Sequence, residues 1–431
     1  MALKVAIIGA GPAGCALARL LQQSGQDIAV NIYESEASLD FRSQGGTLDL
    51  HVKTGQACLK AANLFPQFEE HARYDGEAMN ICDKHLLSYI KQGASKPGSW
   101  TSTGRPEIDR PKLRELLYNS LAPGTVKWSH KLTFISPPAS SSPNSKPILD
   151  FSNAPDAMDF DLIVGADGAF SRVRPYLSDT QPFYSGIAGH AFRIPNAETE
   201  HPELYTLANR GSLFSFSDGR SIMAQYMGDG SLNCATWAVR PATWKDEGWD
   251  VHDPKAVKER VRQEYADWDP RLVAFTQAAE EGPGGVVPRD LFMLPIGHEW
   301  EHRKGVTLIG DAAHVCTPFA GEGVNLALED AMKISNAIVA AAAETGDEEA
   351  RREVLDKKVK EFEKDMFVRA KATAQMTWDM MNAMYMVPGA PRDGIEKYII
   401  TAVEGEMGWW LTRLLLKPLV YAYFFVFKMI W

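Results

Sequence analysis

The sequence lacks the patterns that mark several large classes of protein. Its five cysteines are scattered and odd in number, and their spacing fits neither a disulfide framework nor a metal site. We therefore expect free or buried thiols, no bound metal, and a reducing compartment, the cytoplasm. The net charge of −10 and the lack of a basic stripe with interleaved aromatic residues exclude nucleic acid as a partner. No internal repeat and no Ser-His-Asp set is visible in the sequence.

Long apolar runs are missing as well. The last stretch, residues 409–431, is strongly apolar but is interrupted by three cations and a proline, Arg413, Lys417, Pro418 and Lys428. Its longest uninterrupted run, residues 419–427, is far shorter than the roughly 20 residues that span a bilayer. Pro418 predicts a break or kink at that point. We expect two short helical pieces buried against the protein body, and the alternative is a helix that makes peripheral contact with a membrane.

What is present fits a globular enzyme of two or three domains, since 431 residues are too many for one simple core. The first motif is at the N-terminus, where a strand over residues 4–8 runs into Gly9-Ala10-Gly11-Pro12-Ala13-Gly14 and a helix over 15–23. A second strand, residues 28–33, ends on Glu34. In this context Gly9 makes the tight turn, Gly11 lets the backbone approach a pyrophosphate, and Gly14 lets helix and strand pack closely. Glu34 is placed to accept hydrogen bonds from ribose hydroxyls.

The second motif joins a buried strand over residues 306–309 to a helix over 324–339 through a turn rich in glycine and proline. Its characteristic residues are Gly310, Asp311, His314, Pro318, Gly321, Gly323 and Asn325. Unpaired N–H groups and a positive dipole at the start of that helix suit an electron-rich ligand. Asp311 at the strand end could accept hydrogen bonds from a polyol. Taken alone, the same residues also fit an ordinary strand–turn–helix connection with a capping aspartate, and His314 is interpreted as structural.

Several polar residues between these motifs are ambiguous from their pattern alone. Arg42, Asp49 and His51 in the loop around Gly45-Gly46 could be surface residues. Arg110 and Arg114 are four residues apart, which predicts one helical face, and each could be a solvated charge or a ligand contact.

From about residue 181 to 288, short alternating strands and turns predict an antiparallel sheet and a second domain. Aromatic and methionine side chains there suit a bulky, flat ligand, although most also fit an ordinary sheet core. They are Phe192, Tyr205, Phe214, Phe216, Met223, Tyr226, Met227 and Trp237.

Three motifs stand in a fixed order: residues 9–14 with Glu34, Asp167-Gly168 with Ser171 and Arg174, and residues 310–325. Together they resemble the single-component (class A) FAD-dependent aromatic hydroxylases, monooxygenases with the p-hydroxybenzoate hydroxylase fold. Residues 45–51, 108–117 and 268–269 are most similar to the TetX-like subgroup, which inactivates tetracyclines.

The resemblance implies an α/β fold in which a Rossmann-like FAD-binding domain (GR2 type) carries an inserted antiparallel-sheet substrate domain and C-terminal helices. The implied FAD-binding domain covers residues 1–180 and 291–345, and the implied substrate domain covers residues 181–290. Residues 76–105 could belong to the substrate domain instead, and residues 346–431 would form the C-terminal helices.

The resemblance also assigns residues to FAD. They are Gly9, Gly11, Gly14, Glu34, Asp49, Arg110, Arg114, Asp167, Asp311, Gly321, Gly323, Val324 and Asn325. The N-terminal group would hold the ADP half and Asp311 the ribityl chain, while Arg110, assisted by Arg114, would contact the flavin. The turn from Pro318 to Asn325 would lie beside the isoalloxazine, where its N–H groups stabilise negative charge on the reduced ring. Arg42 matches an NAD(P)H contact.

The implied reaction uses NADPH or NADH and O₂ to hydroxylate or epoxidise a bulky aromatic or polycyclic metabolite, indole-like or polyketide, through a flavin C4a-hydroperoxide. The reaction would serve secondary metabolism or detoxification. The enzyme is expected to be a monomer. Because there is no second GxGxxG motif, NAD(P)H is expected to bind transiently in a cleft. The alternatives are a flavin-dependent halogenase, although no Trp-x-Trp-x-Ile-Pro signature is found, and a Rab-escort-like binding module without redox chemistry.

Overall fold

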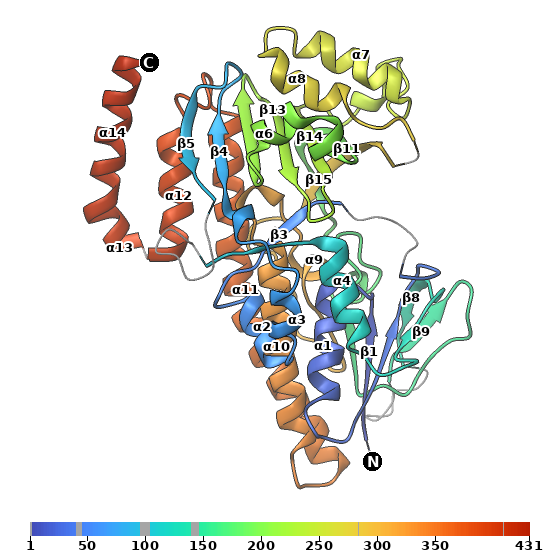
Figure 1. Cartoon of the computed structure of the whole chain (residues 1–431). Coiled ribbons are helices and arrows are strands. Elements are labelled where there is room, and N and C mark those ends of the chain that lie inside the picture. The colour runs from blue at the N-terminus through green and yellow to red at the C-terminus, as the bar shows by residue number, and fades with distance from the viewer. Residues whose placement is uncertain (1, 40–44, 95–103, 139–145, 283, 408) are drawn as a thin grey trace.

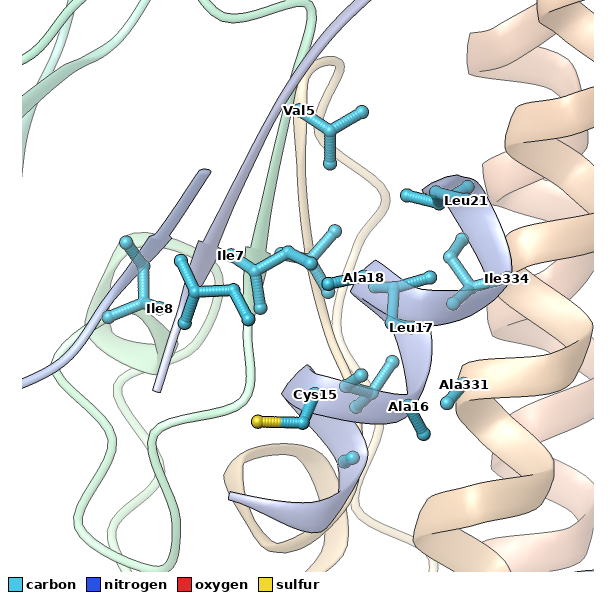
Figure 2. Close-up of a cluster of buried hydrophobic side chains, with 14 of the residues drawn as sticks. Val5, Ile7, Ile8, Cys15, Ala16, Leu17, Ala18, Leu21, Ala331 and Ile334 are labelled. Atoms are coloured by element: carbon cyan, nitrogen blue, oxygen red, sulfur yellow. The ribbon is translucent and has the colours of Figure 1, made fainter. Parts of the chain in front are cut away.

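A five-stranded parallel sheet forms the first layer of the computed structural model (Figure 1), which describes residues 2–39, 45–94, 104–138, 146–282, 284–407 and 409–431. Its strand order is β16-β10-β1-β2-β7. The strands are β1 (Leu3–Ile8), β2 (Ile28–Tyr33), β7 (Val126–Lys127), β10 (Leu162–Gly165) and β16 (Val306–Leu308). Figure 2 shows Ile7 on β1 and Leu17 on α1 in one apolar cluster with Ile334 on α10, and all three are fully buried. This packing sets both glycine-rich turns at the carboxyl edge of the sheet.

A seven-stranded sheet forms the second layer, in the order β15-β11-β14-β13-β12-β4-β5 (Figure 1). The strands are β4 (Met79–Cys82), β5 (Ser88–Gln92), β11 (Phe183–Ile194), β12 (Ser212–Ser217), β13 (Arg220–Tyr226), β14 (Leu232–Val239) and β15 (Val286–Met293). The expected antiparallel pairing holds except between β12 and β4, which run parallel. Two of these strands, β4 and β5, come from the chain segment that precedes the predicted substrate domain. The boundaries of the domains stay a prediction.

Two small sheets and the helices complete the fold. The small sheets pair β3 (Thr47–Asp49) with β6 (Glu107–Asp109), and β8 (Leu132–Ser136) with β9 (Ile148–Phe151). The helices of the first 345 residues are α1 (Pro12–Gln22), α2 (Gly55–Ala61), α3 (Phe65–Glu69), α4 (Arg110–Asn119), α5 (Ala197–Glu200), α6 (Pro202–Ala208), α7 (Pro254–Glu264), α8 (Pro270–Gln277), α9 (Asp311–His314) and α10 (Gly323–Ala342). The sequence pattern predicts that residues 126–135 form one strand paired with residues 148–152. The pairing is confirmed for β8 and β9, but the single strand is wrong, because residues 126–127 form a separate strand, β7, in the parallel sheet.

The first of the C-terminal helices packs with its first half in the core of the parallel sheet, while its end and the later helices pack against the seven-stranded sheet. The C-terminal helices are α11 (Glu348–Tyr385), α12 (Ile395–Met407), α13 (Trp409–Leu411) and α14 (Lys417–Ile430). The interruption expected at Pro418 takes the form of a π-helical turn, Thr412–Leu416, after which α14 begins with the proline in its first turn. A proline fits there because the first-turn N–H groups have no partner within the helix.

The prediction that this apolar end is buried was wrong for most of it. Only Val420 and Phe424 of α14 are buried, and Figure 1 shows the helix standing on the outer side of α12. A single helix on an outer layer buries one stripe and leaves the rest in solvent. The exposed large side chains are Trp410, Leu414, Leu415, Leu419, Tyr421, Tyr423, Phe425, Val426, Met429, Ile430 and Trp431. Within the described residues, no helix has both the length and the apolarity to cross a membrane. Peripheral contact with a membrane stays a prediction.

Candidate active site

The first glycine turn combines two tightly packed positions with one open position. Gly9 has a φ of +106°, and a Cβ there would lie 2.4 Å from the carbonyl oxygen of Ala166. A Cβ at Gly14 would lie 2.1 Å from the carbonyl oxygen of Gly9. A Cβ at Gly11 would meet no atom within 4 Å, and Gly11 caps α1 without any side-chain hydrogen bond to the helix start. The turn therefore leaves space and free N–H groups where an anionic ligand would bind.

A buried ion pair braces this turn from behind. The amide of Ala10 donates to Oε2 of Glu34 (2.7 Å), and the amide of Glu36 donates to Oε1 (2.9 Å). Arg114 on α4 donates from Nε to the carbonyl of Ala10 (3.1 Å) and from its terminal nitrogen to Glu36 (2.7 Å). Because the side chains of Arg114 and Glu36 are only 6% and 7% exposed, little water screens their attraction. The pair fixes the backbone of the turn between β1 and α1.

The second motif reaches the first through direct packing. A Cβ on Gly310 would lie 3.6 Å from Cβ of Ala13 and 3.2 Å from Cβ of Ala327, so the end of β16 is wedged between α1 and α10. Asp330 on α10 holds this junction, since it accepts from the amide of Gly310 (3.1 Å) and lies 2.5 Å from Nε2 of His314. His314 is buried, which fits the structural role expected for it. Asp311, in contrast, is exposed beside this junction.

The turn before α10 is open on one side and held on the other. It contains a 3-10 turn, Pro318–Ala320 (η4), followed by Gly321 with a φ of +70°. A Cβ at Gly323 would meet no atom within 4 Å, and α10 starts without a side-chain cap. Behind the turn, Asn325 donates to the carbonyls of Asp49 (2.9 Å) and Gly321 (3.4 Å). Two uncapped helix starts, those of α1 and α10, thus belong to the two packed motifs.

Asp167 follows β10, between the strands that carry the two motifs. Its Oδ2 accepts from the amide of Arg172 (2.6 Å), while Oδ1 is buried without a partner among the described residues. Burial raises the pKa of the Asp167 carboxyl above its usual range, although hydrogen bonds oppose that shift. A buried oxygen without a partner at the carboxyl edge of a parallel sheet indicates a place for a ligand.

A family model described as "FAD binding domain" matches residues 2–280 and 294–363, most of the chain. The chain belongs to this FAD-binding family. The protein is a flavoprotein monooxygenase, and its curated relatives include monooxygenase penA of Penicillium thymicola, which is 28% identical over 91% of this chain and 97% of the relative. FAD is its cofactor, and the open space at Gly11 and Gly323 fits such a ligand.

Solved structures confirm the fold of this monooxygenase. HpxO of Klebsiella pneumoniae, complexed with FAD and uric acid, superposes with a TM-score of 0.72 at 18% identity and covers 95% of both chains. Tetracycline destructase Tet(51) gives a TM-score of 0.65 at 16% identity, with 96% of this chain and 98% of the other covered. The predicted resemblance to aromatic hydroxylases with the p-hydroxybenzoate hydroxylase fold is therefore confirmed.

The arginines expected at the flavin lie in different environments. Arg110 is exposed and its guanidinium has no partner in the part of the chain that the structure describes, whereas Arg114 is buried behind the first turn. The four-residue spacing predicted that both arginines lie on one face of a helix. Arg110 is the first residue of that helix, α4, and is exposed at the helix end. Arg42 lies outside the described residues, so its contact with NAD(P)H stays a prediction.

The aromatic residues expected at the substrate divide between the two faces of the seven-stranded sheet. Phe192 is buried in the cluster under α6, α7 and α8, and Tyr226 packs against the same cluster. The pattern of the sequence could not separate these faces, because adjacent strands contribute apolar residues to both. On the opposite face, Phe214, Met223 and Trp237 remain half-buried near Phe319 of the flavin-side turn.

Three residues at the site were missed or left undecided by their pattern. Glu36 pairs with Arg114, and Glu322 faces His51. His51, which its pattern left undecided, is buried, with Nε2 2.9 Å from Asp49 and Nδ1 3.4 Å from Glu322, so it is not a surface residue. The sequence around Glu36 and His51 does not indicate these contacts, because their partners Arg114 and Glu322 are distant in the chain and approach only in the folded protein.

Proposed function

We propose that this monooxygenase oxygenates a bulky, flat, fused-ring metabolite, indole-like or polyketide-derived, with NAD(P)H and O₂. The observation that carries the proposal is the half-buried apolar face of the seven-stranded sheet. Phe214 lies directly across from Met223, and Trp237 lies on the next strand, on the same face. Phe319, from the turn expected to hold the reactive ring, belongs to the same apolar cluster. Half-buried aromatic side chains beside a cofactor suit a flat ligand and exclude water from it.

A polar end of this face adds a constraint on the substrate. Gln225 and Asn233 are cross-strand partners on the same face as Met223 and Trp237. Oδ1 of Asn233 would lie 3.1 Å from a Cβ at Gly45. The amides can donate and accept hydrogen bonds, so we infer a substrate with a carbonyl or hydroxyl group at one edge. The uric acid in the HpxO complex and the tetracycline in the name of the destructase are both fused-ring compounds, which supports this class.

The residues of the two motifs would hold FAD in the following way. The N–H groups at the start of α1, open at Gly11, would bind the pyrophosphate, and Glu34 would receive the ribose hydroxyls. Asp311 would bind the ribityl chain, and the start of α10 at Gly323 and Val324 would face the electron-rich edge of the ring. FAD supplies the redox chemistry when bound, and the protein orients it and excludes water. The reductant has no dinucleotide fold of its own in the sequence, so we infer transient binding.

Replacing Asp311 by alanine tests the assignment of the ribityl site. The carboxylate is exposed and has no hydrogen-bond partner among the described residues, so the melting temperature of the FAD-free protein should not change. Losing a charge-assisted hydrogen bond to a hydroxyl should reduce the free energy of FAD binding by about 1.5–3 kcal/mol, which raises Kd roughly ten- to hundred-fold. FAD fluorescence measures the Kd, with Asp179→Ala, another exposed aspartate, as the control. An unchanged Kd in Asp311→Ala would remove this residue from the site.

The substrate class is tested with purified enzyme, NADPH, isotopically labelled O₂ and a panel of fused-ring compounds and simple benzoates. We expect one labelled oxygen atom in a fused-ring product. Trp237→Ala should raise KM for that substrate about ten-fold or more, because the contact of a large apolar side chain is worth roughly 1.5–3 kcal/mol. Val239→Ala, exposed on the same strand, is the control. Turnover of benzoates alone, or a halogenated product, would overturn the proposal.

A further inference from the structure

His51 lies between two carboxylates that come from different parts of the fold. Its Nε2 is 2.9 Å from Oδ2 of Asp49, the last residue of β3, and its Nδ1 is 3.4 Å from Oε2 of Glu322, the residue that precedes α10. The imidazole is only 11% exposed. Asp49 and Glu322 are the charged groups that act most strongly on the ring. Asn325 of α10 accepts from the amide of His51 (2.8 Å), and Gln56 of α2 donates its amide to the His51 carbonyl (3.0 Å).

A carboxylate beside each ring nitrogen favours a doubly protonated ring. An ionised carboxylate only accepts hydrogen bonds, and a neutral imidazole has a single N–H to donate. Both contacts can therefore be hydrogen bonds only in the imidazolium form. Burial by itself would lower the pKa of His51, but the hydrogen bonds to Asp49 and Glu322 outweigh it and raise the pKa to about 9.

The contact between Glu322 and His51 affects the start of α10, because Glu322 is the residue before that helix. Short polar side chains in the N-cap position accept from the free N–H groups of their own helix, and Glu322, in that position, makes no such bond at the start of α10. Its carboxylate is drawn instead to His51. The N–H groups around Gly323 thus stay free on the open side of the turn, and two carboxylates beside them face a cation. Without the cation, Asp49 and Glu322 would add uncompensated negative charge at this turn.

We propose that His51 is a positioning residue for the flavin: as an imidazolium it holds Glu322 off the start of α10 and Asp49 against Gly321, so that the turn can accept an electron-rich ring. A Cβ at Gly321 would lie 3.2 Å from Oδ1 of Asp49, so this contact also sets the distance between β3 and the turn. The inference rests on the proposed placement of the ring at the start of α10.

The test compares His51→Gln with Glu322→Gln and the double variant, all as FAD-loaded enzyme. FAD released on dilution, followed by its fluorescence, gives Kd, and dye equilibration gives the reduction potential. We expect His51→Gln to reduce the affinity for FAD about ten-fold and to make reduction of the bound flavin less favourable. The reason is that the negative charge of Asp49 and Glu322 is then no longer balanced by the imidazolium. Glu322→Gln should restore most of the loss when added to His51→Gln. This rescue separates positioning from a general structural defect.

A second histidine that lies between two carboxylates, outside both glycine-rich turns, provides the control. His302 lies with Nδ1 2.6 Å from Glu363 and Nε2 3.1 Å from Asp356, both on α11. His302→Gln should leave the Kd and the potential unchanged even if it lowers the melting temperature. In the wild type, the affinity for FAD should be constant at pH values well below 9 and should fall as the pH rises through about 9, because the ring then loses its charge. In His51→Gln this pH dependence should be lost.

Two outcomes would overturn the inference. The first is a His51→Gln enzyme with the Kd, potential and pH profile of the wild type. The second is a loss that Glu322→Gln does not relieve. Gly323→Ala separates this failure from that of the proposed ring site, because its Cβ enters open space in the protein. If Gly323→Ala weakens FAD and His51→Gln does not, only the role of His51 is wrong. If neither weakens FAD, the ring is not at this turn and both assignments fall.

Discussion

Gly11→Ala is expected to reduce FAD affinity by at least about a hundred-fold, equal to roughly 2.7 kcal/mol, without loss of stability in the FAD-free protein. Gly11 has a φ of −77° and a ψ of 178°, which any residue adopts easily, and its Cβ would meet no protein atom within 4 Å. The added methyl group therefore collides only with a ligand that approaches the start of α1. Fluorescence titration with FAD and thermal unfolding without it measure the two effects separately.

Gly14→Ala, three residues further along, should show the opposite behaviour. Its Cβ would lie 2.1 Å from the carbonyl oxygen of Gly9, and a backbone atom in a turn braced by Arg114 cannot move aside. We expect a loss of about 3 kcal/mol or more in the free energy of unfolding, with or without FAD. If Gly11→Ala destabilised the FAD-free protein as much as Gly14→Ala, the open space at Gly11 would not be a ligand site.

Arg114→Met should cost about 3–5 kcal/mol in the free energy of unfolding, because the buried Glu36 carboxylate loses the guanidinium that lies 2.7 Å from it. The methionine keeps most of the apolar stem of the side chain, so the loss reports the charge and the hydrogen bond to Ala10 more than the packing. Urea unfolding measures it. Adding Glu36→Gln should recover part of the loss, since the buried charge is then removed.

The same helix provides a matched control for this pair. Lys112 and Glu115 on α4 also form an ion pair, at 2.7 Å, but their side chains are 41% and 46% exposed. Lys112→Ala should therefore change the free energy of unfolding by only about 0.5 kcal/mol or less. Equal losses in Arg114→Met and Lys112→Ala would show that burial does not strengthen the Arg114–Glu36 pair.

The elements of the core were predictable because their signals are local. Residues 28–33 were predicted as a strand and form β2 with those bounds, and the helix predicted over residues 324–339 lies within α10. Gly9 and Gly14 could be interpreted from their spacing alone, since a tight turn and a close helix contact are properties of a few successive residues. The mistakes concern what local pattern does not contain. The segment 126–135 divided between two sheets because strand pairing is decided by distant partners.

The amino-acid sequence by itself determined the family, the cofactor and the two glycine turns, because each depends on backbone conformations that glycine at fixed spacing allows. Tertiary structure alone decided which charges meet. It buried Arg114 on Glu36 and left Arg110 in solvent, and it set His51 between Asp49 and Glu322, which are 273 residues apart in the chain. It also separated Phe192 from Trp237 on opposite faces of one sheet. Charge pairing and burial depend on neighbours in space, and those neighbours exist only once the two layers have packed.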